Sequence, residues 1–68
     1  MSPYIVLYHA EGQHAFDPPL LFRCQAEDAD HAEEQCQDAE PEAEVLWIVQ
    51  THDPEVARAD YYQPWGDA

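Results

Sequence analysis

Apolar residues gather in three short runs that predict β-strands. Residues 4–9 and 45–50 are rich in β-branched and aromatic side chains, and residues 20–26 show an alternating pattern. Residues 45–50 are apolar on both faces, so we expect this run to be the central strand. The alternation in the middle run places three side chains on one face, with Arg23 and Gln25 on the other: Phe22, Cys24 and Ala26.

A helix is expected over residues 29–39. Asp28 can cap its N-terminus, acidic residues fill the first turn, and Pro41 follows its end. Small apolar residues recur at steps of three and four and form a narrow stripe suited to close packing on a sheet. The stripe consists of Ala29, Ala32, Cys36 and Ala39.

The remaining segments complete a small α+β architecture. Gly and paired Pro in residues 11–19 predict a long hairpin loop. Asp53 followed by Pro54 predicts a short helix over residues 54–59, with a turn into a fourth strand as the alternative. Residues 61–65 look aromatic and irregular. We therefore expect a single β-β-α-β domain over residues 1–68, with one helix packed on a three- to four-stranded sheet and a short C-terminal helical or irregular element.

Charge narrows the possible functions more than any motif does. Fifteen Asp and Glu oppose two Arg and no Lys, which gives a formal net charge of −13 on 68 residues. Such an excess of negative charge opposes compaction by self-repulsion. In a folded chain it therefore indicates either adaptation to the environment or binding to a basic partner. Eight aromatic residues argue against a disordered acidic tail. The alternative is a halophilic or merely solubilising surface.

The acidic residues concentrate on the outer arc of the predicted helix and continue beyond both of its ends. Carboxylates one helical turn apart, roughly 5.4 Å, match the range of neighbouring phosphates along a nucleic-acid strand. A groove built for a nucleic-acid backbone could accept them. The candidate partner-binding residues are Glu27, Asp30, Glu33, Glu34, Gln37, Asp38, Glu40, Glu42 and Glu44.

Aromatic residues near the C-terminus are a second candidate set. Tyr61, Tyr62 and Trp65 either cover a small core or anchor an interface, where Tyr and Trp are over-represented. Arg23 and Arg58, the two cations, are expected to form local ion pairs with this excess of carboxylates.

Metal binding and catalysis have little support in the sequence. Cys24 and Cys36 can be a core pair, a disulfide or part of a metal site, and buried free thiols are the default in a chain without export signals. The four His and two Cys lack the spacing of a zinc site. No phosphate loop or nucleophile signature is present. We expect no cofactor, no metal and no enzymatic activity.

No signal peptide or membrane span is evident in residues 1–68, and an anionic lipid surface would repel the chain. The expected location is therefore cytoplasmic.

In its architecture, the chain resembles the small acidic inhibitors encoded by phages and mobile elements, including anti-CRISPR proteins and other DNA mimics. The residues that carry the resemblance are the opening strand 4–8, the strand-to-helix passage 26–34 and the strand 44–49. The resemblance implies a protein that binds a CRISPR effector subunit or another host DNA-binding protein, in the bacterial cytoplasm if phage-encoded. It would block access of DNA without catalysis.

Two functional hypotheses follow. The first is a non-catalytic inhibitor, monomeric or homodimeric, that presents DNA-like charge to a basic nucleic-acid-binding protein and does not bind nucleic acid itself. The second is a structural or accessory protein that self-associates through a Leu46/Ile48 sheet face or the 61–65 cluster, with acidity serving solubility or halophilic adaptation.

Overall fold

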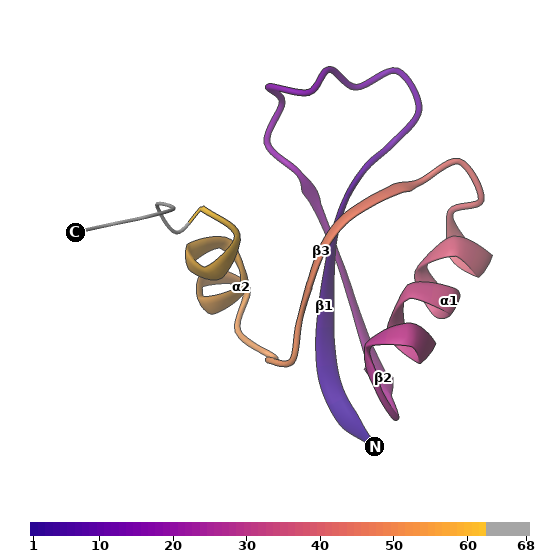
Figure 1. The fold of residues 1–68 in the computed structure, drawn as a ribbon, viewed down its shortest axis with the longest axis vertical. Coiled ribbons are helices and arrows are strands. Elements are labelled where there is room, and N and C mark those ends of the chain that lie inside the picture. Colours follow the sequence, from indigo (N-terminus) through magenta and orange to yellow (C-terminus); the bar gives the residue numbers. More distant parts are fainter. Residues whose placement is uncertain (63–68) are drawn as a thin grey trace.

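The computed structural model describes residues 1–62, which form a three-stranded antiparallel sheet with one helix on each face (Figure 1). The α+β prediction is confirmed. The elements in chain order are β1 (Ser2–His9), β2 (Leu20–Ala26), α1 (Ala29–Ala39), β3 (Glu44–Val49) and α2 (Pro54–Tyr61). Within the described residues the sheet has three strands, and the alternative fourth strand is a helix.

The central strand is β1, not β3, because the strand order is β2-β1-β3. Ile5, Val6 and Leu7 have no exposed surface, since β1 is paired on both edges and covered on both faces. Residues 45–49 are only half-buried, as expected for an edge strand. The prediction that residues 45–50 form the central strand was therefore wrong. A run of apolar residues is expected for a central strand, but it is equally expected for an edge strand whose two faces are each covered by a helix.

The path from β2 through α1 to β3 is a split crossover. Both outer strands are antiparallel to β1, so they run parallel to each other with β1 inserted between them. Because of this path, α1 begins at the end of the sheet where β2 finishes, and residues 40–43 lead from the end of α1 to the first residue of β3. Glu44 there pairs with His9, the last residue of β1.

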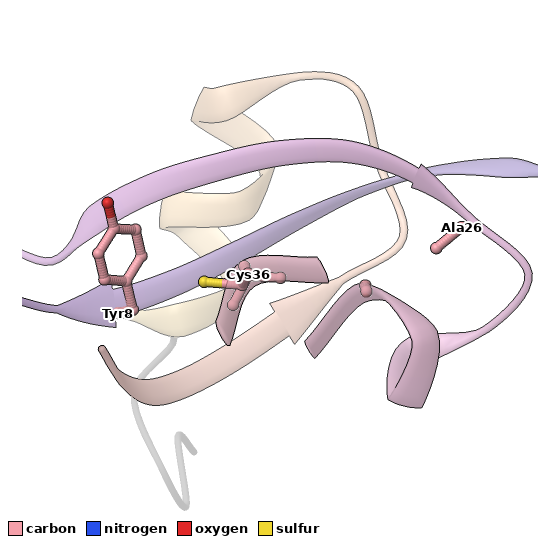
Figure 2. Packing of buried hydrophobic residues seen from close by; sticks show 5 residues of the cluster. Tyr8, Ala26 and Cys36 are labelled. Carbon is pink, nitrogen blue, oxygen red and sulfur yellow. The ribbon is translucent and has the colours of Figure 1, made fainter. Parts of the chain in front are cut away.

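Two apolar clusters lie on opposite faces of β1. On the α1 face, Val6 and Tyr8 pack against Ala26, Ala32 and Cys36 (Figure 2). The small side chains Ala26 and Ala32, both fully buried, let the helix approach the sheet closely. Ala32 and Cys36 thus confirm the centre of the predicted stripe. Ala29 and Ala39 at its two ends are exposed instead.

On the other face, Ile5 and Leu7 pack against Ala57 of α2, and Trp47 covers the cluster from β3. Asp53 caps α2 with its side chain, which accepts a hydrogen bond from the Glu55 N–H at 3.0 Å. This helix continues to Tyr61, two residues beyond the predicted end.

A β-bulge at Leu46 interrupts the alternation of β3, whose apolar side chains pack in both clusters. Leu7 pairs with Trp47 and Tyr8 pairs with Val45, which leaves Leu46 as the extra residue. The bulge shifts the alternation, so that Val45 and Ile48 pack in the cluster under α1. Leu46 belongs to neither cluster. Ile48 of the predicted Leu46/Ile48 face thus packs in the core under α1, and the two residues do not share a cluster.

Candidate partner-binding surface

Helix α1 presents its acidic residues on the arc that faces away from the sheet. Cys36 and Ala32 point into the core, and the opposite side carries Asp30, Glu34 and Asp38, all exposed. The helix is held at its start by Asp28, whose Oδ1 accepts the His31 N–H at 2.8 Å. At its end, the Glu40 N–H donates to the Cys36 carbonyl at 2.8 Å. The carboxylates are thus mounted on a rigid, capped element.

All nine predicted partner-binding residues reach the surface. Glu33 is half-buried and the other eight are exposed. They run along α1 and on through the connection to the start of β3, the side to the right in Figure 1. We call this set the acidic track: Glu27, Asp30, Glu33, Glu34, Gln37, Asp38, Glu40, Glu42 and Glu44.

The acidic track is not compensated by cations. Arg23 pairs with Ile5 in the sheet and so lies on the α2 face, and Arg58 is in α2 itself. Neither Arg forms an ion pair anywhere in residues 1–62. The predicted local ion pairs are therefore absent from the described part of the chain. The two cations lie on the opposite side of the sheet from nearly every carboxylate of the track.

A shallow, open hollow lies at the first turns of α1, lined by Glu27, Asp30, His31 and Glu34. His31 Nδ1 accepts the Glu27 N–H at 3.1 Å, and Gln35 Nε2 donates to the Gln25 carbonyl at 2.7 Å. These bonds tie the helix to the end of β2. In residues 1–62, no His, Cys, Asp and Glu side chains are grouped closely enough to hold a metal ion.

Both cysteines are free thiols between α1 and the sheet: Cys36 belongs to α1 and is fully buried, and Cys24 belongs to β2 and is half-buried. Burial raises the pKa of each thiol; for Cys36, the neighbouring Cys24, Glu40 and Glu33 raise it further. Burial and then Glu40 and Cys36 likewise raise the pKa of Tyr8. Cys36 belongs to the core cluster on the α1 face, and Cys24 packs against that cluster.

The aromatic candidates lie on the other face. Trp47 and Tyr61 stack edge to face with ring centroids 6.4 Å apart, and Tyr61 and Tyr62 do so at 4.9 Å. Tyr61 covers the α2-side cluster, whereas Tyr62 keeps 56 % of its surface exposed. Trp65 lies outside the described residues. The structure thus separates the acidic track from the aromatic set.

One exposed side chain was missed by the sequence reasoning. Phe16, in the loop between β1 and β2, is 100 % exposed. The sequence feature that could have identified Phe16 is a single large apolar residue between Gly12 and the Pro18-Pro19 pair, in a loop where polar residues are usual.

Comparison with protein-family models, with curated proteins and with solved structures gives no match to this chain. Neither α1 nor α2, the helices of the described region, is long and apolar enough to cross a membrane.

Proposed function

We propose that this protein is a non-catalytic inhibitor of a nucleic-acid-binding protein, and that the acidic track occupies the partner's nucleic-acid groove. The observation that carries the proposal is the uncompensated charge of the track. Residues 27–44 hold nine Asp and Glu with no Arg or Lys, and both arginines lie on the α2 side of the sheet. The partner is a basic DNA-binding protein of the bacterial cytoplasm, with a CRISPR effector subunit as one example.

The dimensions of α1 support this role. Eleven helical residues span about 16 Å, which is about five base-pair steps of 3.4 Å. Asp30, Glu34 and Asp38 follow one another at four-residue spacing, with their Cβ atoms about 6 Å apart. A row of carboxylates at this spacing offers Lys and Arg side chains the same kind of acceptors as a phosphate backbone.

The track also has a stability cost that a purely structural helix would avoid. Like charges four residues apart, such as Glu34 and Asp38, destabilise a helix by about 0.2–0.5 kcal/mol per pair. No described cation lies near enough to relieve them. A basic partner would remove this repulsion on binding. The same charge speeds encounter and makes affinity fall as salt rises.

The test is capture from bacterial lysate by the immobilised full chain, with washes at low and then moderate salt and with DNA as competitor. The expected result is one dominant nucleic-acid-binding protein that both salt and competitor DNA displace. A captured protein that excess DNA leaves in place would contradict the proposal, because the track would then not occupy the nucleic-acid groove.

A further inference from the structure

The loop between β1 and β2, residues 10–19, holds Phe16 outside the protein. The ring is 100 % exposed, and it belongs to neither core cluster. Figure 1 shows the loop extending beyond the end of the sheet, away from the bodies of both helices. An apolar ring displayed in this way gains nothing for the isolated chain, because it removes no apolar surface from water.

Hydrogen bonds within the loop hold Phe16 in this exposed position. His9, only 6 % exposed, has its Nε2 2.9 Å from the Asp17 carbonyl, which ties the loop to the end of β1. The His14 N–H donates to Asp17 Oδ2 at 2.9 Å, and the Asp17 N–H donates to the His14 carbonyl at 3.0 Å. These two bonds close a turn over residues 14–17, and Phe16 is the third residue of that turn. The ring is therefore carried on a pre-formed turn.

A second set of contacts supports the other half of the loop. The Ala10 N–H donates to Gln13 Oε1 at 2.6 Å, and the Gln13 N–H donates back to the Ala10 carbonyl at 3.1 Å. Gly12 has a φ of 93°, a backbone conformation that a side chain would strain. Pre-organisation of this kind lowers the ordering cost of binding.

The surroundings of the ring are anionic. The loop carries Glu11 and Asp17 and has no Arg or Lys. His9, at the base of the loop, pairs with Glu44 of β3, so the loop lies at the same end of the sheet as the last part of the acidic track. The loop that carries the ring thus projects from the end of the sheet at which the acidic track finishes.

We propose that Phe16 enters a pocket in which the partner ordinarily stacks an unpaired nucleobase, which makes the partner a single-strand-binding protein. This inference rests on the proposed function and narrows it. Single-strand sites combine a cationic groove for the backbone with aromatic or Arg platforms for the bases. The acidic track matches the groove, and an aromatic ring on a loop that also carries Glu11 and Asp17 matches a base flanked by phosphates. Direct stacking of Phe16 on nucleic acid is opposed by the same carboxylates.

The experiment uses two defined probes: the lysate proteins that elute from single-stranded DNA–cellulose, and those that elute from duplex DNA–cellulose. Each is passed over the immobilised full chain as wild type, Phe16→Ala, Phe16→Trp or Val56→Ala. Val56 is a matched control, since it is an exposed apolar residue on α2. Equal urea midpoints for the four proteins establish that the exposed-site variants fold.

We expect the wild-type chain to capture a protein from the single-strand fraction, and we expect oligo(dT) to displace that protein. Phe16→Ala should lower retention about tenfold or more, Phe16→Trp should retain it, and Val56→Ala should not change it. Capture alone does not support the inference. Retention by Phe16→Ala equal to wild type, capture from the duplex fraction only, or direct binding of labelled oligo(dT) by the chain would overturn it.

The charge-reversed variant Glu34→Lys/Asp38→Lys separates this inference from the function on which it rests. Loss of capture in that variant, together with normal capture by Phe16→Ala, leaves the proposed function standing and removes the role of Phe16. If neither variant changes capture, or if neither fraction yields a captured protein, both proposals fail.

Discussion

Trp47 donates its indole Nε1–H to Asp60 Oδ2 at 2.6 Å, a bond that joins the edge strand β3 to helix α2. The same indole lies edge to face with Tyr61, the last residue of α2. These contacts hold the short second helix against the face of the sheet opposite α1. The Asp60 carboxylate therefore has a structural role, whereas the carboxylates of the acidic track reach the surface and are available to a partner.

The first prediction concerns this bond. Asp60→Ala should lower the free energy of unfolding by about 1–2 kcal/mol, because a charge-assisted hydrogen bond is lost at a partly exposed site. Asp60→Asn keeps a carbonyl oxygen as acceptor and should lose less. Urea denaturation followed by Trp fluorescence measures both. Equal midpoints for wild type and Asp60→Ala would show that the bond does not hold α2 in place.

The second prediction separates capping from binding at Asp28. Its carboxylate accepts the His31 N–H at 2.8 Å and begins α1. Asp28→Ala should lower stability by about 1 kcal/mol, whereas Asp28→Ser, which keeps a capping oxygen, should lose much less. Both variants remove the same charge. If the two prove equally stable, the cap is not what fixes the start of α1.

The third prediction concerns the buried thiol. Cys36 has no exposed surface and packs with Val6 and Tyr8. Cys36→Ser should lower stability by about 1–3 kcal/mol, because it places a hydroxyl where a small apolar group packs. Cys24→Ser, at a half-buried position, should cost less. The order of the two urea midpoints tests this, and a less stable Cys24→Ser would contradict the packing described for the α1 face.

The fourth prediction is a loss of stability at alkaline pH. Burial raises the pKa of Cys24 and Cys36 above the ordinary 9.0, and that of Tyr8 above 10.0. The folded state therefore holds these protons more tightly than the unfolded state. This contribution to stability is complete below the ordinary values and is lost as pH rises through the raised ones.

Urea midpoints at neutral pH and in steps above pH 9 measure the effect. Cys36→Ala serves as the control and should lose less stability over the same range, because one of the titrating groups is gone. A wild-type midpoint that rises with pH through this window would contradict the assigned burial.

The helices were predictable because their ends carry local signals. Asp28 and Pro41 delimit α1 in the sequence, and the structure places the helix over Ala29–Ala39 as expected. Asp53 and Pro54 likewise fix the start of α2. Capping and proline effects act over a few residues, so they can be read without knowledge of the rest of the fold.

Strand order was not predictable because it depends on long-range pairing. The bulge at Leu46 changes which side chains of β3 share a face, and no local pattern marks it. The placement of α2 opposite α1 has the same origin, since Ala57 contacts residues of β1 that lie about fifty positions earlier. For the same reason, the sequence did not show that Tyr61 and the acidic track lie on different faces.

The candidate site was predictable only in part. The helical period correctly placed Asp30, Glu34 and Asp38 at the surface. That no arginine lies beside these carboxylates could be learned only from the structure, because the sequence did not show whether α1 and Arg23 would lie on the same face of the sheet. Phe16 carried no periodic signal at all, and its exposure follows from the hydrogen bonds of its loop.

The fifth prediction tests the central claim, that the acidic track binds the partner. Glu34→Lys/Asp38→Lys changes two exposed residues of α1 that make no side-chain bond in the described structure. The matched control Gln50→Lys/His52→Lys/Glu55→Lys changes exposed residues outside the track, from the connection after β3 to the first turn of α2. Each variant moves the formal net charge from −13 to −9, because Glu→Lys or Asp→Lys adds two charges and Gln→Lys or His→Lys adds one.

The decisive measurement is the amount of partner that each variant captures from bacterial lysate at low salt, with equal urea midpoints as the check on folding. We expect the track reversal to reduce capture by at least about tenfold and the control to stay within about twofold of wild type. Equal capture by the two charge-matched variants would contradict the account, because net charge rather than the acidic track would then govern binding.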